Sequence, residues 1–155
     1  MSEKVYPREM HTAEHLLSGT IGRMFGCGRP VTTHLERKKS KVDFDFRNVG
    51  RNLTPEETDA VEQAVNEQIA ERLEVTFETV SRAAAAAEFD LSHLPVEAAE
   101  VAELRVVQVG DYDRCLCIGE HVANTAEISP LRIISTDYDP ESGRLRIRFK
   151  LEPSV

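Results

Sequence analysis

The sequence predicts an α+β fold, with an antiparallel sheet packed by two main helices. Two stretches predict the helices: an apolar stripe from about Arg8 to Phe25, and a strong helix start at Leu53–Glu57. The segment Lys41–Arg47 predicts a half-buried strand, because its residues alternate strictly between apolar and polar. A sheet covered by helices is an α+β arrangement. A chain of 155 residues can bury one core, so we expect a single domain over residues 1–155.

The first expected helix carries two histidines at the border of its buried face. Its apolar stripe consists of Leu16, Leu17, Ile21, Met24 and Phe25. His11 and His15 fall one residue off that stripe, a position that suits side chains reaching into a pocket. After the helix, Pro30–Glu36 and Lys41–Arg47 are predicted to form a hairpin that turns through Arg37–Ser40.

The second expected helix has a well-defined start. Thr54 is its N-cap, Pro55 takes the first helical position, and Glu57 closes a capping box. This helix is expected to run to about Leu73. The remaining elements are predicted as a strand at Val75–Val80, a short helix at Ser81–Glu88, a surface excursion at Phe89–Glu100, a strand at Leu104–Val109, and a terminal hairpin of Leu131–Thr136 and Arg144–Leu151.

Composition restricts the class of protein. No apolar run approaches the ~18 residues of a transmembrane helix, and the N-terminus lacks the apolar stretch of a signal peptide. Three cysteines are too few for a disulfide framework, so we expect a cytoplasmic protein with reduced thiols and no membrane partner. The net charge of −8 argues against a general nucleic-acid binder. A local basic cluster, Arg37–Lys41, can nonetheless make one edge basic, and its simplest role is to protect a strand edge from pairing.

Two short stretches, about a hundred residues apart, offer ligands for a metal ion. They are H-T-A-E-H, from His11 to His15, and C-I-G-E-H, from Cys117 to His121. Positions i and i+4 lie on one face of a helix, so the first pair can point both imidazoles at one ion. The second pair adds a thiolate and a third imidazole. Three histidines and one cysteine suit Zn²⁺.

Two observations limit what the first stretch can indicate on its own: one concerns a metal site, the other a metalloprotease. Histidines four residues apart on a helix are often simply buried and hydrogen-bonded. The order H-T-A-E-H also differs from H-E-x-x-H, because Glu14 follows His11 by three positions instead of one. The general base of a metalloprotease is therefore out of place.

The residues around both stretches resemble the editing domain of alanyl-tRNA synthetases, which is related to that of threonyl-tRNA synthetases. The four spaced ligands match the family pattern H-x3-H and C-x3-H. The flanks H-T-A-E-H-L-L, D-F-D-F, L-T-P-E-E and C-I-G-E-H-V-A-N-T-A-E-I look like the corresponding family segments, and the resemblance extends from about Tyr6 to Phe149. The chain departs from longer members of the family at Ile118, Glu120, Ala126 and Ser129.

The resemblance implies an enzyme and a cofactor. Short, free-standing members of the family remove wrongly attached amino acids, mainly serine, from alanine tRNA. It therefore implies an aminoacyl-tRNA deacylase that acts in trans on seryl-tRNA(Ala), with Zn²⁺ held by His11, His15, Cys117 and His121. A metal-bound water with a pKa of ~7 is then the expected nucleophile, or the ion polarises the ester carbonyl. Four protein ligands are also typical of a structural zinc site. The ion can therefore either take part in catalysis or only position the substrate, and the sequence leaves both roles open.

The resemblance also suggests residues that recognise the substrate. Serine differs from alanine by one hydroxyl, and a pocket that hydrogen-bonds this hydroxyl can reject the analogue lacking it by ~10⁴–10⁵. Thr32 and Thr33 lie on the strand that the resemblance places beside the metal site, and one of them can face the pocket. Thr12 and Glu120 are further candidates. The residues expected to contact tRNA phosphates are Arg37, Lys38, Lys39 and Lys41.

Two other functions stay open at this level. One is a non-catalytic, zinc-stabilised module that binds tRNA or a synthetase. The other is an editing hydrolase for seryl-tRNA(Thr). The sequence does not indicate the oligomeric state.

Overall fold

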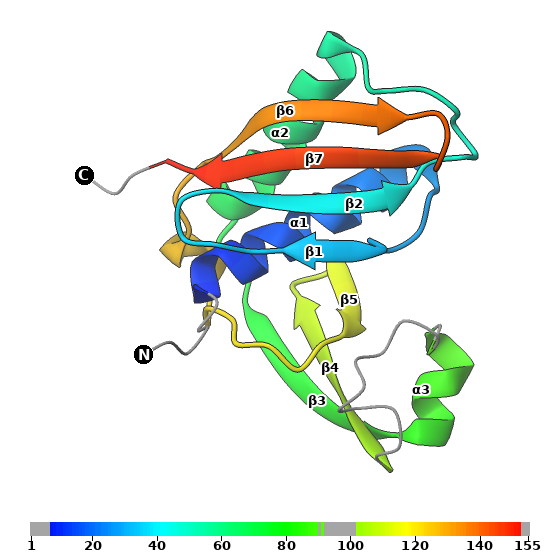
Figure 1. The fold of residues 1–155 in the computed structure, drawn as a ribbon. Helices are drawn as coiled ribbons and strands as arrows, with labels where there is room; N and C mark the ends of the chain where they lie inside the picture. Colours follow the sequence, from blue (N-terminus) through cyan, green and yellow to red (C-terminus); the bar gives the residue numbers. More distant parts are fainter. Residues whose placement is uncertain (1–6, 90, 92–101, 153–155) are drawn as a thin grey trace, which may run out of the picture.

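The strands of the protein form two antiparallel sheets (Figure 1). The structure, a computed structural model, describes residues 7–89, 91 and 102–152. The larger sheet has the strand order β1 (Thr32–His34), β2 (Ser40–Asp45), β7 (Arg144–Leu151) and β6 (Leu131–Asp139). The smaller sheet has the order β3 (Val75–Ser81), β4 (Glu103–Val109) and β5 (Asp113–Leu116). The predicted α+β class is confirmed, and the division of the strands between two sheets adds to it.

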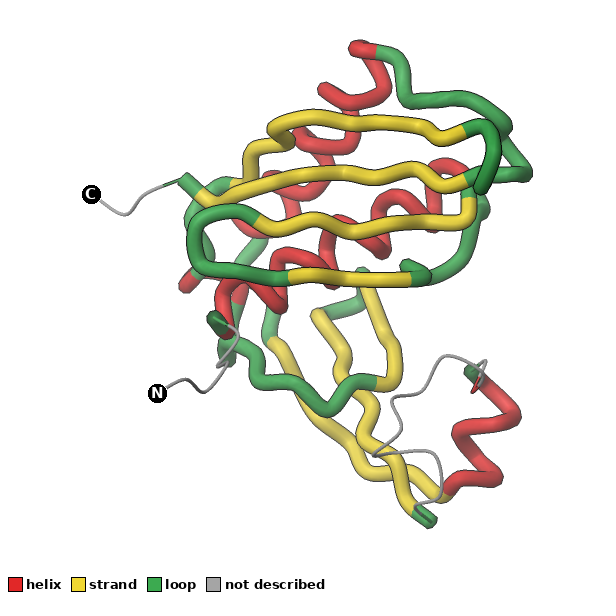
Figure 2. The backbone as a smooth tube through the Cα atoms, in the orientation of Figure 1, coloured by secondary structure: helices red, strands yellow, loops and turns green. Residues whose placement is uncertain are grey.

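Two main helices cover one face of the larger sheet, as Figure 2 shows. Helix α1 spans Arg8–Phe25, the bounds that its apolar stripe predicts. Helix α2 spans Pro55–Ala70 and has the predicted capping box: the Thr54 hydroxyl accepts the Glu57 amide, and the Glu57 carboxylate accepts the Thr54 amide. A short helix, α3 (Arg82–Glu88), and a 3₁₀ turn, η3 (Thr125–Glu127), complete the described helices.

The main core lies between the larger sheet and these two helices. In β2, Val42 and Phe44 are fully buried in the core, whereas Lys41 and Asp45 are half-buried. Asp43, between the two core residues, is also buried and pairs with Arg146, so burial does not alternate as strictly as the apolar and polar residues do. Leu16, Leu17 and Ile21 of α1 and Val61, Val65 and Ile69 of α2 pack into the same cluster. The hydrophobic effect thus fixes α1 against the larger sheet.

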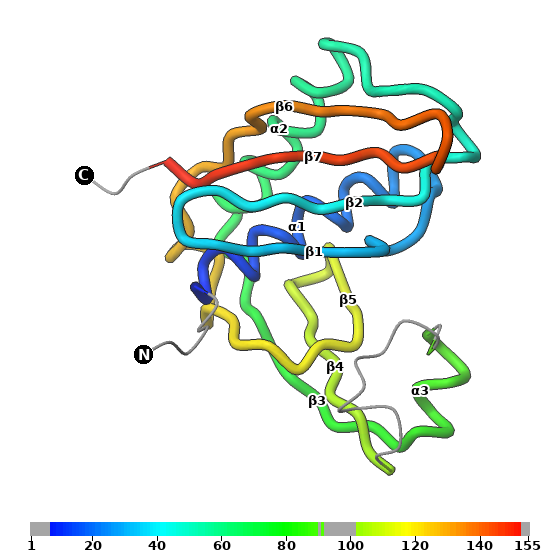
Figure 3. The backbone as a smooth tube through the Cα atoms, in the orientation of Figure 1, coloured from blue at the N-terminus to red at the C-terminus, as the bar shows by residue number. Residues whose placement is uncertain are grey.

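The fold brings the two predicted ligand stretches together. The first turns of α1 lie beside the loop that follows β5, although about a hundred residues separate them in sequence (Figure 3). The expected hairpin of β1 and β2 is present, with Thr33 opposite Val42 and His34 opposite Lys41. The excursion expected at Phe89–Glu100 lies largely outside the described residues. Among the described helices, none is long and apolar enough to cross a membrane.

Candidate metal centre

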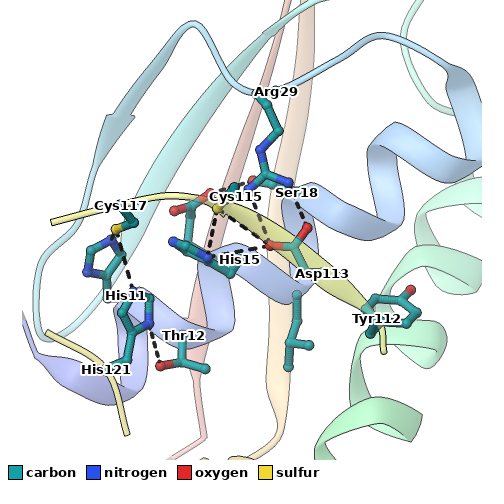
Figure 4. A network of polar contacts seen from close by, with 12 residues as sticks. His11, Thr12, His15, Ser18, Arg29, Tyr112, Asp113, Cys115, Cys117 and His121 are labelled. Carbon is teal, nitrogen blue, oxygen red and sulfur yellow. Dashed lines mark hydrogen bonds and ion pairs between the residues drawn. The ribbon is translucent and has the colours of Figure 1, made fainter. Parts of the chain in front are cut away.

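Four side chains converge where α1 meets the loop after β5 (Figure 4). His11 and His15 lie one turn apart on α1, while Cys117 and His121 bound a loop that has no helical structure. The Cys117 Sγ lies 3.3 Å from His11 Nε2 and 3.5 Å from His121 Nε2. The ring centroids of His15 and His121 are 4.4 Å apart. Each of the four residues offers a ligand atom within 4.8 Å of the others.

This arrangement fits a tetrahedral metal ion. Nitrogen and sulfur ligands at ~2.0–2.3 Å from a tetrahedral ion lie ~3.3–3.6 Å from one another, and the distances from Cys117 Sγ to the two imidazoles fall in that range. The His11 Nδ1 atom is buried and has no hydrogen-bond partner in the described part of the chain. The donor set and the spacing together mark a candidate site for a soft or borderline cation.

The electrostatics of the cluster favour a thiolate. Burial by itself raises the pKa of Cys117, but hydrogen bonds from His11, His121 and His15 lower it to about 3. Burial lowers the pKa of His121, and its histidine neighbours lower it further. At neutral pH the cluster therefore offers an ionised sulfur and a largely neutral His121, which are the protonation states that bind a metal.

Backbone contacts hold the loop in place. The Arg105 guanidinium donates to the Cys117 carbonyl at 2.9 Å and also to the Gly119 carbonyl. A Cβ added at Gly119 would lie 1.9 Å from His11 Cε1, so only glycine lets the loop pass over that ring. Sequence reasoning missed the roles of Arg105 and Gly119. The glycine in the middle of C-I-G-E-H was the one available signal.

Asp113, Cys115 and Arg29 form a second cluster, on the side of His15 away from the other three ligands. The Nδ1 atom of His15 lies 3.3 Å from Cys115 Sγ and 3.5 Å from an Asp113 carboxylate oxygen. Arg29 donates to the same carboxylate at 2.6 Å. The backbone of α1 comes close enough that a Cβ at Gly19 would lie 2.9 Å from Asp113 Oδ1. Asp113 and Arg29 carry no spacing pattern, and the sequence did not reveal them.

The charges of this group indicate support for His15 more than a second metal site. Burial raises the pKa of Asp113, but the hydrogen bond from His15 and the charge of Arg29 bring it below its usual value. Burial lowers the pKa of His15, yet the sulfur of Cys115 and the Asp113 carboxylate hold it well above its usual value. Without a metal His15 is therefore protonated at neutral pH, and it must release a proton to bind one. The Arg29 guanidinium also reaches Cys115 Sγ at 3.4 Å, so a positive charge already neutralises this group. A carboxylate behind a ligating imidazole fixes its ring orientation.

The candidate recognition residues lie in different places. Thr12 is fully buried, with its Oγ1 2.9 Å from His121 Nδ1 and accepting the Val122 amide at 3.2 Å. Its hydroxyl therefore orients His121 inside the protein, which differs from the expected contact with substrate. Glu120 is exposed on the loop. The contact between Thr12 and His121, which are 109 residues apart in sequence, could not be predicted from the position of Thr12 directly after His11.

A hollow of about 620 Å³ opens beside the four converging side chains. His11, His15 and Cys117 line it on one side, and Thr33 of β1 lines it on another. Thr32 points to the opposite face of the sheet, where its hydroxyl donates to Asp43 Oδ2 at 2.9 Å. Of the two threonines that the sequence left open, Thr33 is the one that faces the hollow.

The four basic residues expected to contact tRNA lie at one end of the larger sheet. Arg37, Lys38 and Lys39 are exposed in the turn between β1 and β2, and Lys41 is half-buried in β2.

Fold and side chains together define a small α+β protein with a candidate His₃Cys metal centre beside a hollow.

Comparison with known proteins finds likenesses to aminoacyl-tRNA synthetases. Residues 104–147 match the family described as the threonyl and alanyl tRNA synthetase second additional domain. The alanine–tRNA ligase of Ignicoccus hospitalis is 31% identical over 139 residues, which are 90% of this chain and 15% of the ligase. That of Bacillus subtilis is 35% identical over 130 residues, 81% of this chain and 14% of the ligase.

The chain is therefore similar to the threonyl and alanyl tRNA synthetase second additional domain over residues 104–147, and to part of the alanine–tRNA ligases over most of its length. It spans only 14–15% of the length of the curated relatives named above.

Proposed function

We propose that the protein hydrolyses the ester bond of wrongly charged aminoacyl-tRNA in trans, with seryl-tRNA(Ala) as its substrate. The observation that carries the proposal is that Thr33 lines the same hollow as His11, His15 and Cys117. A group able to recognise a serine hydroxyl thus lies across from a candidate metal centre. The likeness to alanine–tRNA ligases over most of this chain supports alanine tRNA as the carrier. Such a substrate implies action in the cytoplasm.

We further propose that the cofactor is Zn²⁺, held by His11, His15, Cys117 and His121. When bound, zinc supplies Lewis-acid chemistry, because it polarises a carbonyl or lowers the pKa of a water. The protein's own part is to keep the imidazoles in place. The hydroxyl of Thr12 contacts His121 from behind, and the carboxylate of Asp113 contacts His15.

Recognition of serine rests on Thr33 in this proposal. Alanine is smaller than serine, so an apolar pocket alone would accept both. Thr33 is exposed in the free protein, so its hydroxyl is shielded from water only when a bound aminoacyl group covers it. A polar group covered in this way, and left unpaired by alanine, costs ~1–3 kcal/mol. The hollow of about 620 Å³ is within the ~300–1,000 Å³ typical of small-molecule sites, so it has room for an aminoacyl group and part of the terminal nucleoside.

The function is tested with charged tRNA. Serine-charged and alanine-charged alanine tRNA, and serine-charged threonine tRNA, are each incubated with the protein, and ester loss is followed against a no-protein control. We expect loss of serine from alanine tRNA. Binding without turnover would replace the proposal by a non-catalytic, zinc-stabilised module, which the closed set of four ligands would then explain. Faster hydrolysis of the charged threonine tRNA would reassign the substrate.

A pair of variants tests recognition. Thr33→Val keeps the shape of the side chain but removes its hydroxyl, so kcat/KM on seryl-tRNA(Ala) should fall by ~5–150-fold while activity on alanine holds or rises. Thr32→Val is the matched control, because that side chain lies on the other face of the sheet. If neither variant changes the serine-to-alanine ratio, the assignment is wrong, and Glu120 is the next residue to test.

The metal is tested by elemental analysis of the purified protein. We expect one zinc per chain and its loss in His15→Ala, since this variant removes one of four ligands. Full zinc occupancy in the variant would rule out the assigned ligand set.

A further inference from the structure

A second, smaller hollow lies on the opposite face of strand β1. It has a volume of about 220 Å³ and is lined by His34, Glu36, Lys39, Ser40, Lys41 and Arg148. Cross-strand pairing explains why these side chains meet, because His34 lies opposite Lys41, and Lys41 lies opposite Arg148. Three neighbouring strands of the larger sheet therefore present a row of nitrogen-bearing side chains on one face.

The surroundings of this hollow are basic in an acidic protein. The whole chain has 27 acidic and 19 basic residues. The turn and the outer-face positions around the hollow reverse this balance, with Arg37, Lys38, Lys39, Lys41, Arg132, Arg148 and Lys150 against Glu36, Asp137 and Glu152. The three carboxylates are bound to His34, Arg148 and Arg132 respectively. Within the described residues, the structure gives no ion-pair partner to Lys39, Lys41 or Lys150, so their charges remain available to a ligand.

Hydrogen bonds of Ser40 close the turn that carries Lys39. The Ser40 hydroxyl accepts the Glu36 amide at 2.8 Å and donates to the Glu36 carbonyl at 3.2 Å. Arg148 is likewise fixed, because it donates to Asp137 at 2.7 Å. Donors that are already positioned lose little conformational entropy when they bind an anion.

We infer that this hollow binds a backbone phosphate of RNA, contacted by Lys39, Lys41 and Arg148. Lysine and arginine are the usual phosphate ligands, and phosphate contacts dominate the affinity of RNA-binding surfaces. The site rests on the proposed function, because it takes the polymer strand whose aminoacylated end occupies the larger hollow.

The position of β1 connects the two hollows. Thr33 faces the larger hollow, and its neighbour His34 faces the smaller one. Strand β1 is the edge of its sheet, and a strand is only ~4.8 Å wide. A nucleic-acid strand whose end lies in the larger hollow can pass around this edge and place an upstream phosphate beside Lys41. The surface therefore extends beyond the turn, onto β7 at Arg148 and Lys150.

The test measures the affinity for fluorescently labelled, uncharged tRNA at several salt concentrations. The variant carries Lys41→Gln together with Arg148→Gln. We expect its Kd to rise by about tenfold or more, and the slope of log Kd against log salt to fall by about 2, since two phosphate contacts are lost. The matched control is Arg144→Gln, on the same strand and the same face but opposite Asp45 and Asp139. Its Kd and slope should stay at the wild-type values.

Two further measurements distinguish loss of RNA binding from misfolding and from failure of the proposed function. Lys39→Gln changes only an exposed turn residue, so a reduced salt slope in that variant excludes misfolding as the cause. Hydrolysis of a seryl ester of adenosine, which lacks the tRNA body, should be the same in the wild-type protein and in Arg144→Gln. An unchanged Kd and slope in both variants would overturn the inference. If no variant and no wild-type protein hydrolyses any ester while the binding pattern holds, the proposed function fails and the phosphate site stands.

Discussion

The two sheets differ in what holds them. The larger sheet packs against two helices through a continuous apolar core that includes the fully buried Phe44, Phe46 and Phe149. The smaller sheet shares part of that core through Val107 and Val109. Its far end has, among the described residues, a separate cluster of only two buried side chains, Ala85 and Leu104.

The candidate metal centre joins these unequal regions. Two of its histidines lie on α1, which the main core fixes, and its other two side chains lie on the loop that leaves the smaller sheet. The larger sheet is therefore held mainly by apolar burial, whereas the loop after β5 depends on polar contacts and on any bound metal.

The largest effect should come from the core of the larger sheet. Phe44→Ala should lower the free energy of unfolding by ~3–5 kcal/mol, because it leaves a cavity at a fully buried position. Urea titration followed by circular dichroism measures the change. Phe77→Ala in the smaller sheet is the control, and its ring is 47% exposed, so the expected loss is much smaller. Equal losses would show that the smaller sheet depends on side-chain burial as much as the larger sheet does.

Removing the metal should affect the smaller sheet selectively. A ligand present at 100 times its Kd stabilises the protein by ~2.7 kcal/mol, equivalent to ~100-fold in amide exchange. Hydrogen exchange with and without a chelator should show this change in β4, β5 and the loop from Cys117 to His121. Amides of β2 and β7 should exchange as before. Uniform acceleration across both sheets would contradict the division into two regions.

The support behind His15 should have an intermediate effect. Asp113→Asn keeps the shape but removes the charge that faces the imidazole, so zinc affinity should fall by ~10–100-fold. Competition with a chromogenic chelator gives the affinity. Asp111→Asn, at an exposed position in the turn just before β5, is the matched control. If both variants bind zinc like the wild type, the Asp113 carboxylate serves only to anchor Arg29.

The smallest effect should come from the start of α2. Thr54→Ala removes the N-cap hydroxyl and should cost ~1 kcal/mol of global stability. Because α2 belongs to the larger region, zinc affinity should not change. A parallel loss of zinc affinity would show that the metal centre depends on the stability of the whole core.

The elements that local signals determine were predictable from the sequence. The apolar stripe of α1, the capping box at Thr54 and the alternation around Phe44 each depend on residues close together in the chain. The pairing of β3 with β4 and β5, away from the larger sheet, depends on contacts that are distant in sequence. A single antiparallel sheet was therefore the simplest expectation, and two sheets are what the chain forms.

The candidate site was predictable only where it repeats a spacing. The two pairs of ligands, each four residues apart, were visible in the sequence, and the structure brings them within 4.8 Å. Asp113, Arg29 and Arg105 act singly, so nothing in their spacing marks them. The choice between Thr32 and Thr33 also needed the register of β1, because neighbouring residues of a strand point to opposite faces. The binding of zinc by the four candidate ligands, and of substrate by Thr33, stays a prediction.

The use of both faces of β1 has a consequence for how this segment tolerates change in length. Its three residues place Thr32 and His34 on one face and Thr33 on the other. Deleting or inserting one residue between Pro30 and Leu35 would exchange these faces along the strand. Both hollows would lose their side chains in a single step, although no charge and no hydrophobic residue had been replaced. Homologues of this protein should therefore vary in composition here far more readily than in length.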